Sequence, residues 1–98
     1  MPDYLLALDE HALSLADGIN DFPNHAVAIG GEIRELDATL EAVERVLGRG
    51  NRKSVQDVRA AIRNTGRVET KAQARDLLER VRQLQRQLRY QASEEEWT

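Results

Sequence analysis

Apolar residues recur at alternating spacings of three and four along most of this 98-residue chain. This spacing constrains the fold more than any other feature of the sequence. An α-helix places residues with this spacing on one face, and three consecutive heptads are typical of a coiled-coil-like seam. Because a helix with one apolar face needs other helices to cover it, we predict an all-α protein. The most regular seam is Ala26, Ile29, Ile33, Leu36, Leu40, Val43 and Leu47.

Two other long stretches carry the same pattern, and a shorter one lies between them. The short stretch contains Val55, Val58 and Ile62, with Ser54 as its expected N-cap and residues 64–66 as its end. Short connections at 18–24, 48–51 and 64–69 favour an antiparallel four-helix bundle with three long helices and one short one. The other two long seams are Leu5, Leu8, Ala12, Leu15, Ile19 and Phe22, widened by Leu6 and Leu13, and Ala74, Leu77, Val81, Leu84 and Leu88.

Local signals predict how these helices begin and pack. Pro23 suits the first turn of the second helix, which Asp21 or Asn24 could cap. Thr70-Lys71-Ala72-Gln73 is a capping-box pattern at the start of the last helix. The pair Gly30-Gly31 lies inside a helical seam, where glycine is unfavourable, so we expect a close approach to a neighbouring backbone.

The length of the chain fits a single domain, which we place at residues 1–92. The last six residues, 93–98, lack the helical periodicity and carry three glutamates in a row. We predict that they form a flexible acidic tail.

Charge is segregated along the chain, although the net charge is only −3. Residues 1–48 hold ten acidic residues against two arginines, whereas residues 49–89 hold twelve basic residues against four acidic ones. The acidic half coincides with the first two predicted helices and the basic half with the last two. We interpret the segregation as a means of pairing helices, within one chain or between chains.

Composition excludes several classes of function. The chain has no cysteine, and no apolar run reaches the length of a membrane span. His11 and His25 have no second ligand at i+3 or i+4 that forms a known metal pattern, and we found no catalytic constellation. We therefore predict a cytoplasmic protein that is not an enzyme and has no catalytic residues, metal site or cofactor.

The expected short third helix would leave part of a seam uncovered, and a second chain could cover it. We predict a protein interaction or oligomerisation module, forming a homodimer or binding a helical partner, with no membrane span. An ordinary intrachain core is the alternative role for the same residues. The predicted interaction residues are Ile33, Leu36, Leu40, Val43, Leu77, Val81, Leu84 and Leu88.

Nucleic-acid binding by the basic region 49–89 is a less favoured alternative. A cluster of basic side chains can neutralise phosphates, but the whole chain is acidic and the region has no aromatic stacking platform. The candidate contacts are Arg49, Arg52, Lys53, Arg59, Arg63 and Arg67.

Two family resemblances add to these predictions. Residues 12–49, with the run GEIRELDATL at 31–40, resemble the N-terminal helical domain of fungal NLR-type and HeLo-like proteins, although the apolar, glycine-rich N-terminal segment is missing. That resemblance implies a signalling or self-association module. The run YQASE at 90–94 is similar to the tail motif of WXG-type proteins of type VII secretion, but Gly48-Arg49-Gly50 stands where those proteins have Trp-x-Gly. It implies a small helical secretion partner.

Overall fold

The computed structural model describes the backbone of residues 3–22 and 24–97, and all of their side chains except those of residues 3, 49 and 91–97. It contains four helices: α1 (Asp3–Asn20), α2 (Ala26–Val46), α3 (Arg49–Thr65) and α4 (Lys71–Trp97). No strand occurs in the described part of the chain. The prediction of an all-α protein with four helices is confirmed.

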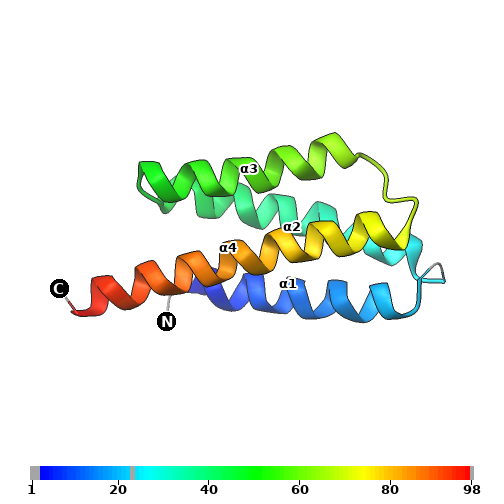
Figure 1. Ribbon diagram of the computed structural model, residues 1–98, viewed down its shortest axis with the longest axis horizontal. Helices are drawn as coiled ribbons and strands as arrows, with labels where there is room; N and C mark the ends of the chain where they lie inside the picture. Colours follow the sequence, from blue (N-terminus) through cyan, green and yellow to red (C-terminus); the bar gives the residue numbers. More distant parts are fainter. Residues whose placement is uncertain (1–2, 23, 98) are drawn as a thin grey trace.

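The helices lie side by side along the long axis of a body of 46 × 22 × 18 Å (Figure 1). Helix α1 packs against α2 and α4, and α3 packs against the same two helices from the other side. The beginning of α1 and the end of α4 lie toward the same end of the molecule (Figure 1). This arrangement gives every apolar seam two neighbouring helices to pack against.

All four helices contribute to one continuous core. The seam of α4 is buried as the spacing predicted, and that of α2 is buried from Ile29 to Leu47, whereas Ala26 is only partly buried. Leu40, Val81 and Leu88 have no exposed surface. The seam of α1 is buried from Leu5 to Ile19, whereas Phe22 is only partly buried at its end. The heptad pattern therefore identifies the inner face of each long helix.

The prediction that Ser54 is the N-cap of a short third helix is wrong. Helix α3 begins at Arg49 and has 17 residues, compared with 18 in α1. The segment 48–51, predicted as a turn, mostly forms its first turn, because the Arg52 N–H donates to the Gly48 carbonyl at 2.8 Å. The Arg52 guanidinium also donates to the carbonyls of Glu44 and Leu47 at the end of α2, both at 3.1 Å. These bonds hold the first turn of α3 against carbonyls that the end of a helix leaves free.

Two predictions about helix starts have different outcomes. His25 occupies the N-cap of α2 without a side-chain hydrogen bond, so neither Asp21 nor Asn24 caps this helix. Pro23 lies outside the described residues. The capping box of α4 is confirmed, since the Thr70 hydroxyl accepts from the Gln73 N–H and the Gln73 side chain accepts from the Thr70 N–H.

The predicted close approach at Gly30 and Gly31 is wrong as well, because a methyl group at either residue would meet nothing within 4 Å. The close approach occurs at Gly18 on α1, where such a methyl group would lie 2.9 Å from Cγ1 of Ile29. At the other end of the chain, α4 continues to Trp97 and shows no break at residue 92. Most of the predicted tail is thus helical in its backbone.

Candidate functional site

The eight predicted interaction residues are all buried in the core of this chain. Leu36 and Leu77 are each only 1% exposed, and the least buried of the eight, Ile33, is 6% exposed. The structure brings the α2 and α4 residues into one cluster with α1 and α3. Apart from Ile33, which also lines a surface groove, they can contact a second chain only if the helices separate, so this set does not form a docking surface.

Of the predicted nucleic-acid contacts, Arg59 is the most strongly engaged within the chain. Its guanidinium donates to Asp37 at 3.0 Å and to Glu44 at 2.9 Å, and its side chain is only 15% exposed. The hydrogen bonds to Asp37 and Glu44 raise the pKa of Arg59. A hydrogen bond from Gln56, together with that from Arg59, lowers the pKa of the Glu44 carboxyl. Arg59 is therefore a structural cation that joins α3 to α2.

The remaining members of the basic set do not form one surface of free cations. Arg52 binds backbone carbonyls of α2, and Lys53 lies 3.5 Å from the carboxylate of Asp57. Arg63 and Arg67 are exposed, and neither has an acidic group within 4 Å among the described residues. The side chain of Arg49 lies outside the described part. Two of the six predicted contacts, Arg52 and Arg59, therefore hold α3 against α2.

The outer face of α1 carries an exposed apolar pair that sequence reasoning assigned to the core. Leu6 and Leu13 are 53% and 61% exposed, although we expected them to widen the buried seam. Seven residues apart, they lie two turns apart on the same line of the helix. Glu10 and Asp17 follow each leucine by four residues, are exposed, and have no cationic partner within 4 Å in the described part of the chain. We call Leu6, Glu10, Leu13 and Asp17 the α1 stripe.

A groove of about 830 Å³ opens between α2, α3 and the connection that precedes α4. Its apolar lining includes Val27, which is 88% exposed and is the most exposed large apolar side chain in the described chain. Sequence periodicity gave no indication of this groove, because it combines the ends of two helices with a connection. We call it the α2–α3 groove; its lining residues are Phe22, Ala26, Val27, Gly30, Ile33, Arg34, Asp37, Ile62, Gly66, Arg67, Val68 and Glu69.

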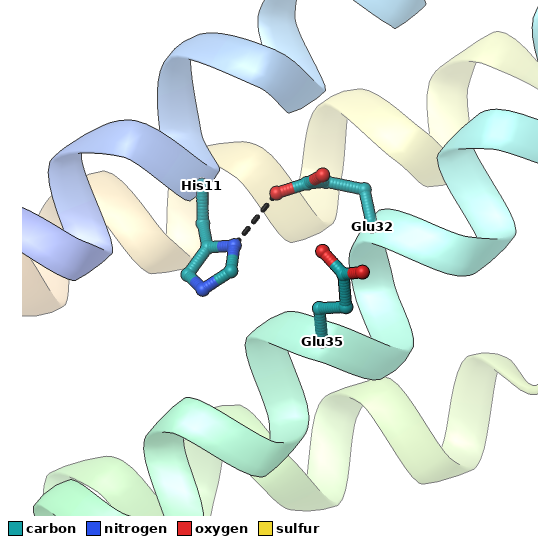
Figure 2. A group of neighbouring side chains, drawn as sticks. All are labelled: His11, Glu32 and Glu35. Carbon is teal, nitrogen blue, oxygen red and sulfur yellow. Dashed lines mark hydrogen bonds and ion pairs between the residues drawn. The ribbon is translucent and has the colours of Figure 1, made fainter.

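A third group of side chains lies across the contact between α1 and α2. Figure 2 shows His11 of α1 directed toward Glu32 and Glu35, which lie one turn apart on α2. The Nδ1 atom of His11 lies 2.6 Å from a carboxylate oxygen of Glu32, and its Nε2 atom lies 2.9 Å from the Thr39 hydroxyl. The sequence shows the Glu32 and Glu35 spacing but not the approach of His11, because that approach depends on how the two helices pack.

No family model, curated protein or solved structure matches this chain. The resemblances to fungal NLR-type and WXG-type proteins therefore stay predictions. No helix among the described residues is long and apolar enough to cross a membrane. The function is therefore inferred from three features of the chain itself: the α1 stripe, the α2–α3 groove, and the group formed by His11, Glu32 and Glu35.

Proposed function

We propose that this protein is a non-enzymatic oligomerisation module, built as an antiparallel four-helix bundle, and that the α1 stripe of one copy docks in the α2–α3 groove of another. The observation that carries this proposal is the pair of exposed leucines on α1, Leu6 and Leu13. Apolar side chains two turns apart on one helix face are the anchors by which a helix binds in an apolar groove.

The groove offers a matching surface. Val27 is exposed at the groove, and Ile33, Ile62 and Val68 contribute buried apolar side chains to its lining. Its volume of about 830 Å³ leaves room for more than one side chain. Two leucines that enter it would transfer apolar surface from water, which is the main driving force of protein association.

The charges around the two surfaces also complement each other. Arg34 and Arg67 line the groove and have no acidic group within 4 Å in the described chain. Asp37 in the same lining binds Arg59, which it shares with Glu44, so Arg34 and Arg67 are the two arginines of the lining beside Asp37 and Glu69. The stripe carries only acidic charges, Glu10 and Asp17, which can pair with these two arginines when the stripe enters the groove.

Because the stripe and the groove are different surfaces, a single contact between two copies leaves the groove of one copy and the stripe of the other unoccupied. A closed dimer makes the contact twice, with each copy supplying both surfaces. We therefore expect a dimer in solution, and an open chain of copies would use the same contact. Core residues such as Leu40 and Leu88 remain inside each bundle in both assemblies.

The test is the mass of the protein in solution, measured by light scattering from micromolar to high-micromolar concentration. We expect Leu13→Glu on the stripe and Val27→Glu in the groove each to convert the assembly to monomers. Val46→Glu is the matched control, because Val46 is 69% exposed on the same helix as Val27 but does not line the groove. Circular dichroism of each variant verifies that the helices remain folded.

Each outcome decides a part of the proposal. A wild-type monomer at all concentrations would refute self-association. An assembly that Leu13→Glu disrupts and Val27→Glu leaves intact would show that the stripe docks outside the groove. Equal disruption by Val46→Glu would show that any added charge breaks the assembly, and the assignment of the surfaces would then fail.

A further inference from the structure

The geometry points to a binding site for a divalent transition-metal ion, held by His11 of α1 and by Glu32 and Glu35 of α2. One ligand atom from each of these residues lies within 4.8 Å of the other two, and no other such group of three occurs among the described residues. Figure 2 shows that the imidazole and both carboxylates converge on the space between the two helices. This site is on a different face of α1 from the stripe and does not depend on self-association.

The distances between the ligand atoms are close to those that a bound metal ion requires. A tetrahedral ion with bonds of about 2.0–2.2 Å holds its ligand atoms about 3.3–3.6 Å apart. The Nδ1 atom of His11 and the carboxylate of Glu32 are 2.6 Å apart and must separate slightly, whereas Glu35 must move inward. Glu35 is exposed and has no ion-pair partner in the described chain, so its side chain can make that movement.

The second nitrogen of the imidazole supports this role. Nε2 of His11 lies 2.9 Å from the Thr39 hydroxyl, which can accept a hydrogen bond from a protonated Nε2. Nδ1 itself donates to the Glu32 carboxylate, and a metal ion that displaces this proton would take the Nδ1 lone pair. A histidine that binds a metal commonly donates its other ring N–H to such an outer partner, which fixes the tautomer and the orientation of the ring.

The negative charge of the site and its partial exposure to solvent also favour the binding of a metal ion. Two carboxylates lie close together here within the acidic half of the chain, and among the described residues the one cation that pairs with them within 4 Å is His11 itself when protonated. A dication would neutralise this excess of negative charge. The side chains of His11 and Glu32 are 17% and 20% exposed, so the site is partly shielded yet open to ions from solvent.

The ligand set selects the class of metal. An imidazole nitrogen favours Zn²⁺ and related first-row ions, whereas Ca²⁺ and Mg²⁺ prefer oxygen ligands alone. Three protein ligands leave a fourth position for water. An ion bound in this way joins α1 to α2 and stabilises the folded chain, because the unfolded chain does not hold the three ligands together.

The experiment is a calorimetric titration of the full chain, without a histidine tag, with Zn²⁺. We expect one equivalent to bind and the melting temperature to rise, with no comparable effect of Mg²⁺. Glu35→Gln should weaken Zn²⁺ binding at least tenfold and abolish the rise in melting temperature. Glu41→Gln is the matched control: it removes the same charge from the same helix and breaks only an exposed ion pair with Arg45, but Glu41 is not part of the group, so binding should be unchanged.

Two further variants separate metal binding from folding. His11→Gln should also lose Zn²⁺ binding, and Thr39→Val should weaken it by about 10–100-fold through the orientation of the imidazole. Co²⁺ in place of Zn²⁺ should show visible absorption bands that change in His11→Gln, which reports the nitrogen ligand directly.

The site is refuted by an absence of Zn²⁺ binding up to about 100 μM, or by binding that Glu35→Gln and Glu41→Gln weaken equally. If His11→Gln fails to fold, Glu35→Gln still decides the question, because Glu35 is exposed and forms no ion pair with another described residue. Wild-type binding combined with a monomeric protein would support the metal site and reject the oligomerisation module, so the two proposals fail separately.

Discussion

Substitution of Gly18 by alanine tests the close approach of α1 to α2, the contact that also brings His11 to Glu32. An alanine Cβ at residue 18 would lie 2.9 Å from Cγ1 of Ile29 and 3.5 Å from its Cδ1. Ile29 is 1% exposed and packed in the core, so it cannot turn toward solvent. One of the two helices must therefore shift, or the isoleucine must leave its preferred rotamer.

The expected change in the free energy of unfolding follows from two opposing effects. Alanine in place of glycine within a helix stabilises by up to about 1 kcal/mol, and by less in a last turn such as that of Gly18. Forcing an extra carbon into a packed core costs about 1–3 kcal/mol. We expect Gly18→Ala to lower the free energy of unfolding by about 1 kcal/mol, which corresponds to a fall of about 4–8 °C in melting temperature for a domain of this size.

The assay is urea unfolding followed by circular dichroism, with all variants at one protein concentration. Gly31→Ala is the control, because its methyl group meets nothing within 4 Å and should raise the free energy of unfolding by about 0.5–1 kcal/mol. In an Ile29→Ala background the contact at 2.9 Å no longer exists, so Gly18→Ala should become stabilising there. The argument is wrong if Gly18→Ala stabilises the wild-type protein, or if its effect is the same in both backgrounds.

Two other variants test single structural features. Gly66→Ala should destabilise the protein by about 1–3 kcal/mol in urea unfolding, because Gly66 has φ = 62° and ψ = −128°, a conformation that glycine alone adopts readily; unchanged stability would contradict this. Arg59→Gln should destabilise the protein at neutral pH, and the difference from wild type should shrink as the pH falls. The lowered pKa of Glu44 gives this sign: its contribution is present above the unfolded-state value, near 4.5, and is lost as the pH falls through the folded-state value. A difference that stays constant from pH 7 to pH 3 would show that Arg59 stabilises the protein only by packing.

The inner faces of the helices could be predicted from the sequence because one interaction dominates them. Residues such as Leu36, Leu40, Leu84 and Leu88 are buried by any packing that covers an unbroken seam of spacing three and four. The capping box at Thr70 and Gln73 was equally predictable, since its hydrogen bonds involve neighbouring residues. In both cases, residues that are close together in the sequence determine the structure.

The failures occur where a distant residue decides the local structure. Glycines at 48 and 50 indicate a turn, but the bonds from Arg52 to the end of α2 favour a helical start at Arg49. Leu6 and Leu13 are as apolar as their buried neighbours, and their exposure follows from where α2 and α4 lie around α1. His11 likewise carries no local pattern with Glu32 and Glu35, because these ligands belong to two helices.

The segregation of charge along the sequence has its main effect inside the chain. Asp37 and Glu44 of the acidic half bind Arg59 of the basic half, and Asp9 binds Arg89 at 3.1 Å in the same way. The pairs of Arg59 are half-buried and are screened by salt much less than exposed charges, so they favour the pairing of α2 with α3 at any physiological ionic strength.

Several charged side chains that form no such pair are exposed on the surface. Glu10 and Asp17 of the stripe, and Arg34 and Arg67 of the groove, are exposed and have no partner of opposite sign in the described chain. Interactions between exposed charges are largely screened beyond the Debye length, which falls from about 8 Å at physiological ionic strength to about 3 Å at 1 M salt. Added salt should therefore weaken the attraction between copies while the fold of each copy stays intact. In the proposed assembly, these exposed charges would supply the salt-sensitive part of the attraction between copies, and Leu6, Leu13 and Val27 would supply its salt-insensitive part.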